Sequence, residues 1–88
     1  MAKDYNRSLE PLYNIISIVA GYIASDQSFD GVATTYFGFL DIEGSWYIQK
    51  QVVTGNDIAW TYARGSGAYA TSWAARDGLT YRLFNAIW

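Results

Sequence analysis

The sequence predicts a mainly β domain, a small antiparallel β-meander or sandwich with one or two short helical segments. Three observations lead to this fold class. Stretches rich in β-branched and aromatic residues follow one another at residues 32–42, 45–53 and 58–64, which is typical of strands. Short turn sequences separate these stretches, so neighbouring strands are expected to run antiparallel. The chain has 88 residues, enough for one small domain without a second core.

Residues 1–30 are expected to form an N-terminal arm or helix, a candidate anchoring segment, ahead of a β-rich domain at residues 31–88. Apolar residues at helical spacing favour a helix in this segment, whereas the β-branched residues among them favour a strand. Both conformations stay open, and the helix is preferred. The apolar residues are Leu12, Ile15, Ile16, Val19 and Ile23. Residues 26–31 combine Asp, Ser and Gly and predict a loop.

Alternation along the predicted strands assigns their side chains to two faces of a sheet. The third strand places Ile58, Trp60 and Tyr62 on one face. For the second strand, one face carries Trp46, Ile48, Lys50 and Val52, and the other carries Tyr47, Gln49, Gln51 and Val53. Gly38 interrupts the first strand, which indicates a bulge or a close backbone approach.

Turn residues divide the second half of the chain. Thr54-Gly55-Asn56-Asp57 predicts the turn of a hairpin between the second and third strands. Gly65-Ser66-Gly67 ends the third strand. A helical turn is expected near residues 71–76, ended by Gly78. Residues 79–88 are expected to form a last strand or helix.

The absence of Cys and His excludes several chemistries. The chain has no disulfide, no thiolate nucleophile and no Ser-His-Asp arrangement, and a zinc site would need carboxylates alone. Asp41 and Glu43 are the candidate carboxylate pair for hydrolysis, but solubilising the turn at Gly44 explains them better. We therefore expect no catalytic residue, no metal, no cofactor and no enzymatic activity.

Charge and hydropathy limit the partners. The net charge is −2, which argues against a nucleic-acid partner because phosphate contacts need a basic surface. The longest uncharged run covers residues 11–25. This run is shorter than the roughly 18 residues that a membrane-spanning helix needs, so we expect no membrane span.

Aromatic residues are the strongest feature of the composition. The 8 Tyr, 4 Trp and 4 Phe make up 18% of the chain. Because a domain of this size buries only about 60% of its unfolded surface, many rings are expected at the surface, where they mark contacts. The candidates for an interface or for ligand stacking are Tyr36, Phe39, Trp46, Tyr47, Trp60, Tyr62, Tyr69 and Trp73. We prefer core and interface roles over a sugar-stacking platform, with Arg64, Arg76 and Arg82 as cation–π partners.

The order of these residues resembles a family. The pattern consists of Tyr36-Phe37-Gly38-Phe39, Trp46-Tyr47-Ile48-Gln49-Lys50, Trp60 before Gly65, and then Tyr69, Trp73, Arg76 and Leu79-Thr80-Tyr81. It resembles a widespread group of short bacteriophage proteins that are usually uncharacterised or called virion structural proteins. The match covers about residues 35–84. The spacer between Phe39 and Trp46 is short for the group, and the first 30 residues lie outside the pattern.

The resemblance implies a structural component of a virion, in the tail, baseplate, fibre or neck, that is assembled in the cytoplasm of the bacterial host. Such a protein is expected to form a homo-oligomer or to dock on other virion proteins. The resemblance supplies no catalytic residue. The alternative is a carbohydrate- or receptor-binding module that holds a host-surface glycan with exposed Trp and Tyr.

Overall fold

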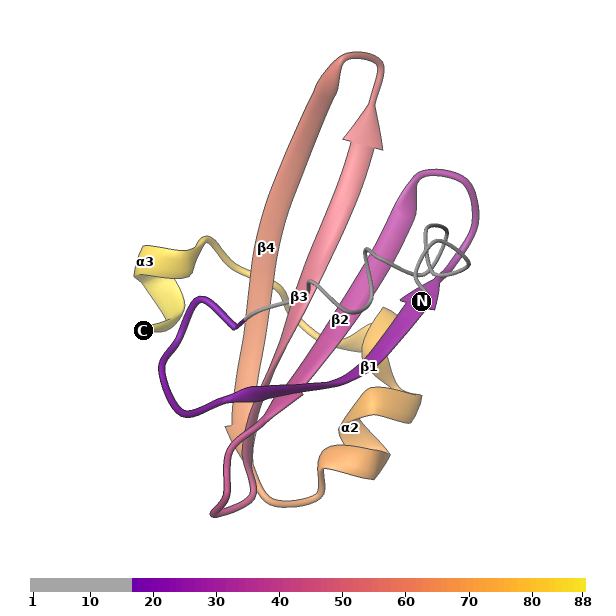
Figure 1. The fold of residues 1–88 in the computed structure, drawn as a ribbon. Helices are drawn as coiled ribbons and strands as arrows, with labels where there is room; N and C mark the ends of the chain where they lie inside the picture. Colours follow the sequence, from indigo (N-terminus) through magenta and orange to yellow (C-terminus); the bar gives the residue numbers. More distant parts are fainter. Residues whose placement is uncertain (1–16) are drawn as a thin grey trace, which may run out of the picture.

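The computed structural model describes residues 17–88. Within these residues, four antiparallel strands form one sheet in the order β1-β2-β3-β4, so each strand pairs with the next one in sequence (Figure 1). The strands are β1 (Ile23–Phe29), β2 (Thr34–Leu40), β3 (Ser45–Thr54) and β4 (Asp57–Ser66). Three short helices follow, which are α2 (Tyr69–Ala74), the 3-10 helix η2 (Arg76–Gly78) and α3 (Phe84–Ile87). The mainly β prediction is confirmed, and its form is the meander.

The β3–β4 hairpin has the turn that the sequence predicts. Thr54 pairs with Asp57, which leaves Gly55 and Asn56 as a two-residue loop. Gly55 has a φ of +60°, the left-handed conformation that two-residue hairpin turns require and that glycine adopts without strain. The register then pairs Val53 with Ile58 and Gln51 with Trp60, and the two predicted faces of β3 are confirmed.

The loop predicted at residues 26–31 is wrong over its first four residues, because they belong to β1. β1 pairs only with β2, and an edge strand needs no continuous apolar alternation. Its polar Asp26 and Ser28 bind residues far away in the sequence, namely Tyr69 and Arg76. Because these partners are distant in the sequence, the polar residues of β1 predict a loop when only their neighbours are considered.

Part of the predicted N-terminal arm therefore belongs to the sheet. Residues 23–29 form its first strand, and the chain before them makes a turn in which Tyr22 N donates to Val19 O over 3.3 Å. Residues 1–16, including most of the candidate helix and anchoring segment, lie outside the described residues.

Gly38 is the point where the second layer approaches the sheet most closely. A Cβ atom added there would overlap the hydroxyl of Tyr69 and lie 3.0 Å from Trp73. On the neighbouring strand, Ala24 pairs with Phe39 and Asp26 with Gly38, so Ser25 is the extra residue of a β-bulge. The close approach is thus at Gly38 itself, and the bulge lies opposite it on β1.

Each face of the sheet carries its own apolar cluster. On the face that we call the α2 face, the buried residues Tyr36, Trp46, Ile48 and Ala63 contact Leu40, Tyr69, Trp73, Leu79 and Tyr81. On the opposite α3 face, the buried residues Phe39, Tyr47 and Tyr62 contact Val19, Tyr22, Phe37 and Ile87. The sheet is therefore covered on both sides near the middle of β3.

The C-terminal segment follows the outer edge of β4 before it reaches the α3 face. Tyr62 N donates to Arg82 O over 2.8 Å, and Arg82 N donates to Tyr62 O over 2.9 Å. Helix α3 starts two residues later. Residues 79–88 thus contain both a strand-like bridge and a helix.

We expect Gly38→Ala to lower the free energy of unfolding by about 1–3 kcal/mol, because the added methyl group displaces Tyr69 from the sheet. Urea denaturation followed by tryptophan fluorescence measures the change. Gly78→Ala is the matched control, since no atom lies within 4 Å of a Cβ placed there. Equal stability of the two variants would contradict the packing described for Tyr69.

Candidate functional site

The eight predicted contact residues divide between the two faces of the sheet. Alternation and the two apolar clusters place Tyr36, Trp46, Tyr69 and Trp73 on the α2 face. They place Phe39, Tyr47, Trp60 and Tyr62 on the α3 face. Rings on opposite faces of a sheet cannot present one common surface. A single stacking platform built from these residues is therefore absent from the structure of residues 17–88.

Five of the eight residues are buried in the core. They are Tyr36, Phe39, Trp46, Tyr47 and Tyr62. Their rings are covered by partners within the chain, as where Phe39 and Tyr47 stack with centroids 4.5 Å apart. Polar atoms of these rings also bond within the chain, as where Trp46 Nε1 donates to Gly67 O over 2.9 Å. These five rings stabilise the fold, and their faces are closed to a ligand.

Tyr69 and Trp73 are half-buried and attach α2 to the sheet. Their rings stack with centroids 6.2 Å apart. The hydroxyl of Tyr69 donates to Asp26 Oδ2 over 2.8 Å. Burial, together with this hydrogen bond, raises the pKa of Tyr69 well above its usual value. The phenol therefore stays protonated and donates the hydrogen bond that holds α2 against β1.

Arg76 forms the second link between β1 and the helical layer. Its Nε lies 3.2 Å from Asp30 Oδ2, and its Nη2 donates to Ser28 Oγ over 2.9 Å. Its Nη1 donates to the carbonyl of Trp73 over 3.0 Å, and its guanidinium carbon lies 4.7 Å from the centre of the Trp73 ring. The hydrogen bond from Ser28 and then the one from Arg76 lower the pKa of Asp30.

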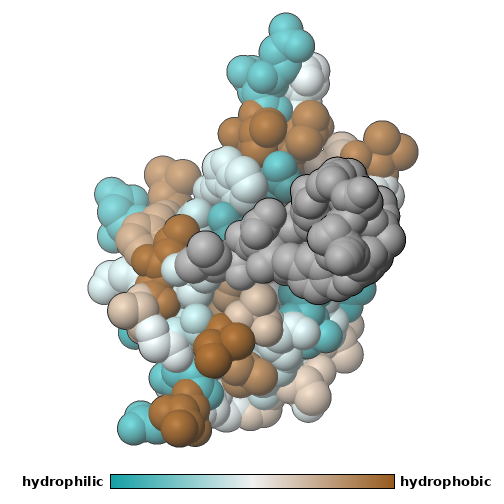
Figure 2. Space-filling view, in the orientation of Figure 1, coloured by the Kyte–Doolittle hydropathy of each residue, from teal (hydrophilic) through white to brown (hydrophobic). Residues whose placement is uncertain are grey.

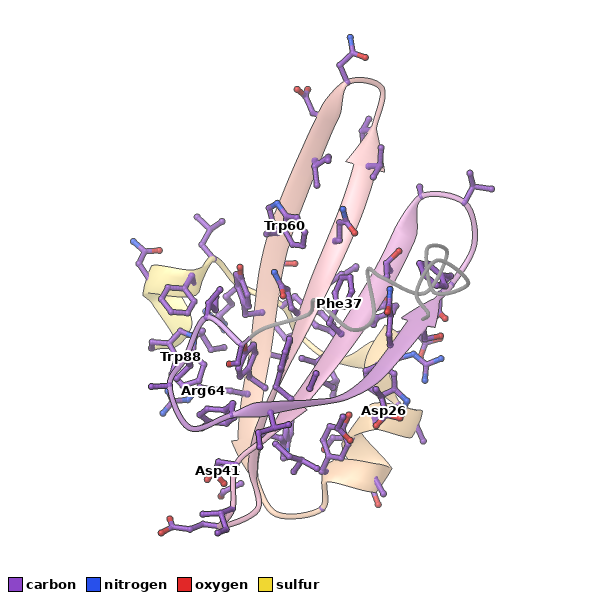
Figure 3. All side chains as sticks on the ribbon, in the orientation of Figure 1. Asp26, Phe37, Asp41, Trp60, Arg64 and Trp88 are labelled. Carbon is purple, nitrogen blue, oxygen red and sulfur yellow. The ribbon has the colours of Figure 1, made fainter. Side chains whose placement is uncertain are left out.

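The C-terminal residue Trp88 joins the two ends of the described chain on the α3 face. Its ring meets Tyr47 edge-on at 5.5 Å and Tyr22 at 6.0 Å. The guanidinium carbon of Arg64 lies 4.2 Å from the centre of the Trp88 ring (Figure 3). The predicted cation–π role is confirmed for Arg76, which lies over the candidate ring of Trp73. Arg64 lies instead over Trp88, a ring outside the predicted set, and Arg82 contributes the backbone bridge to Tyr62.

The carboxylate of Asp41 organises the turn before β3. Its Oδ1 accepts hydrogen bonds from Glu43 N over 2.9 Å and from Ser45 N over 2.8 Å. The side chain thus closes the turn at Gly44, a structural role beyond the solubilising one expected from the sequence. Across residues 17–88, no group of three or more carboxylates is placed to hold a metal ion.

Trp60 belongs to the open surface of the projecting hairpin. We call Val53, Ile58 and Trp60 the hairpin strip. The far end of the β3–β4 hairpin extends beyond β1 and β2 (Figure 1), and the strip lies on the α3 side of it. The three side chains are 40%, 52% and 40% exposed, respectively. Figure 2 shows apolar atoms gathered just below the hydrophilic tip.

The backbone next to the strip is also open. Tyr62 directs both its N–H and its C=O outward to Arg82. Alternate residues of a strand point the same way, so the backbone groups of Ile58 and Trp60 also point outward. No residue in the described part of the chain pairs with them. The hairpin therefore combines exposed apolar side chains with an unpaired strand edge.

Val53 and Ile58 are not among the residues singled out from the sequence. Both flank the predicted turn, where alternation assigns them to the face of Trp60. Their position next to the hairpin tip could have identified them as exposed. Apolar residues at the tip of a hairpin lie far from the other predicted elements, so no other element covers them.

Comparison with protein-family models, with curated proteins and with solved structures finds no match for this chain. None of the helices in residues 17–88 has the length and apolar character needed to cross a membrane.

We expect Asp30→Asn to reduce the acid sensitivity of the fold. A carboxylate whose folded pKa is lowered stabilises the protein above its unfolded value of 3.8, and this stabilisation disappears as the pH falls through the folded pKa. The gap in melting temperature between the wild type and Asp30→Asn should therefore shrink between about pH 6 and about pH 3. Asp57→Asn, at the hairpin tip, is the control. A gap that stays constant with pH would contradict the role of the Asp30–Arg76 pair.

Proposed function

We propose that the chain is a structural component of a bacteriophage virion that acts by self-association, or by docking on other virion proteins, through the hairpin strip. The observation that carries this proposal is the exposure of Val53, Ile58 and Trp60 on one side of a projecting hairpin. The strip contains no charged residue. Clustered exposed apolar side chains mark contact surfaces, and Trp is among the residues that contribute most to protein interfaces.

The two edges of the sheet differ in a way that favours β4 as the contact edge. β1 carries a bulge at Ser25 and a charged side chain, Asp26, that accepts a hydrogen bond from the Tyr69 hydroxyl. Both features protect an edge strand from pairing with another chain. At the far end of β4, Ile58 and Trp60 have open backbone groups and neither kind of protection. A second copy related by a two-fold axis could pair its β4 with this edge, which would satisfy the open backbone groups and bring the two hairpin strips side by side.

The virion assignment is supported by the resemblance over residues 35–84. The pattern residues Tyr36, Phe39 and Trp46 lie in the core, and Arg76 links β1 to the helical layer. Most pattern residues thus stabilise the fold. Of the three residues in the hairpin strip, only Trp60 belongs to the pattern. The copies would be assembled in the cytoplasm of the bacterial host and located in the tail, baseplate, fibre or neck.

The glycan-binding alternative has less support from the geometry. Trp60 pairs across the strands with Gln51, which places one exposed ring beside one amide. The other seven candidate rings are buried or half-buried. Quenching of tryptophan fluorescence by members of a glycan panel, lost in Trp60→Phe, would favour the alternative over self-association.

We expect Ile58→Asp to weaken self-association at least about tenfold, because it places a charge in the centre of the contact. Sedimentation velocity over a dilution series measures the dissociation constant. Ile42→Asp is the matched control, since Ile42 is 98% exposed in the turn before β3, away from the strip. A wild-type chain that stays monomeric at every concentration, or an equal effect of both substitutions, would overturn the role of the strip.

The virion assignment has a separate test. Mass spectrometry of purified particles is expected to detect the chain at a fixed copy number relative to the other particle proteins. Its absence from purified particles would overturn the assignment and leave the self-association measurement unaffected.

A further inference from the structure

The C-terminal segment limits the free part of the β4 edge. Arg82 is bound to Tyr62 across this edge in an antiparallel bridge. Two antiparallel segments run in opposite directions, so the extended residue Leu83 lies beside Thr61. Among residues 17–88, the part of the edge that nothing covers is therefore residues 57–60, which we call the free edge.

A strand that pairs with the free edge has to turn away before it reaches Leu83. The hairpin of this chain has that property, because β4 starts at Asp57 directly after the two-residue loop of Gly55 and Asn56. The β4 strand of a second copy, running antiparallel along the free edge, would approach Leu83 with its hairpin loop in front. Its chain would then leave the edge where the C-terminal segment begins to cover it, whereas a longer straight strand would collide.

The backbone directions of β4 allow few symmetric pairings. At the free edge, Ile58 and Trp60 are the residues whose N–H and C=O groups point outward, as those of Tyr62 do. An antiparallel pair forms hydrogen bonds only where outward residues of both strands lie opposite each other. A two-fold pairing between strand residues therefore has its axis at Ile58, at Ala59 or at Trp60.

Two of these three axes bring the second strand onto the C-terminal segment. An axis at Trp60 places the second strand where Arg82 already lies. An axis at Ala59 places the start of the second strand at the position of Leu83. An axis at Ile58 keeps the second strand within the free edge, and its hairpin loop turns away before Leu83.

The side chains of two copies also match when the axis lies at Ile58. Ile58 then faces Ile58 of the second copy, and Val53 is its neighbour on β3 in each copy. Four aliphatic side chains thus form one row on the α3 side of the joined sheet. On the other side, Asp57 faces Ala59 of the second copy, so no like charges lie directly opposite each other.

We propose that two copies of this chain pair antiparallel through the free edge of β4, with the two-fold axis at Ile58, and that the Arg82 bridge fixes this register by closing the edge at Tyr62. The pairing is the proposed self-association in one defined geometry. It rests on the proposed function, and its register can be wrong while self-association is right.

The absence of Cys from the chain allows a test by disulfide trapping. The full-length Ile58→Cys variant is oxidised, and linked dimers are measured on a non-reducing gel. The axis brings its two Cα atoms to about 5.5 Å, within the range of a disulfide. Ala59→Cys is the matched control, because its two Cα atoms would lie about 8 Å apart. We expect the control to link at least about tenfold more slowly.

A mixture of two variants tests the same register at a different kind of strand position. Residue 57 of one copy lies opposite residue 59 of the other in a pair without hydrogen bonds, with Cα atoms about 4.5 Å apart. Asp57→Cys and Ala59→Cys chains that differ in mass through a tag are therefore expected to form a mixed disulfide. The matched control mixes Asp57→Cys with Thr61→Cys, which lie opposite each other only if the axis is at Ala59.

The possible failures are distinguishable. Faster linking of Ala59→Cys alone, or of the control mixture, would move the axis to Ala59 and overturn the proposed register. Equally slow linking of all variants, while the wild type associates in sedimentation velocity, would overturn the pairing through β4 and leave self-association in place. A wild type that stays monomeric at every concentration would overturn the proposed self-association and this pairing with it.

Discussion

The structure depends on burying both sides of one strand. Trp46, Tyr47 and Ile48 are consecutive residues of β3 and are all buried, the last two completely. Because successive side chains of a strand point to opposite faces, this run can be buried only if something covers each face of the sheet. Residues 17–88 form a single sheet, so no second sheet among them supplies these covers. Short segments therefore supply the covers, and aromatic rings give these segments enough apolar area to hold.

The open surface follows from the size of these covers. The α2 face is covered by a helix of six residues and the chain after it, and the α3 face by residues 17–22 and a helix of four residues. Such short segments cover the middle of β3, whereas β3 and β4 are ten residues long each. The hairpin extends past the covers, and its apolar residues stay exposed. Most of the aromatic excess is thus used inside the domain, with Trp60 as the main exception among the predicted contact residues.

Local sequence signals predicted the parts of the fold that depend on neighbouring residues. Alternation identified the last three strands and their faces, and Gly55-Asn56 identified the hairpin turn. β1 was missed because its polar residues are explained only by partners more than forty positions away, Tyr69 for Asp26 and Arg76 for Ser28. The candidate contact residues were predicted by residue type alone. Which rings are buried depends on where the covers end, and that is a property of the assembled fold.

The difference between the sheet edges also limits how copies can assemble. Pairing through β4 uses the same edge on both molecules, so it closes on itself after two copies. Continued growth would need a second edge, but the bulge at Ser25 interrupts β1, and Asp26 is held by Tyr69. A sheet-extended filament of this domain alone is therefore disfavoured. Under the proposed function, a ring or tube in a virion would need other virion proteins to bridge such pairs, so the proposed self-association and the proposed docking would act together.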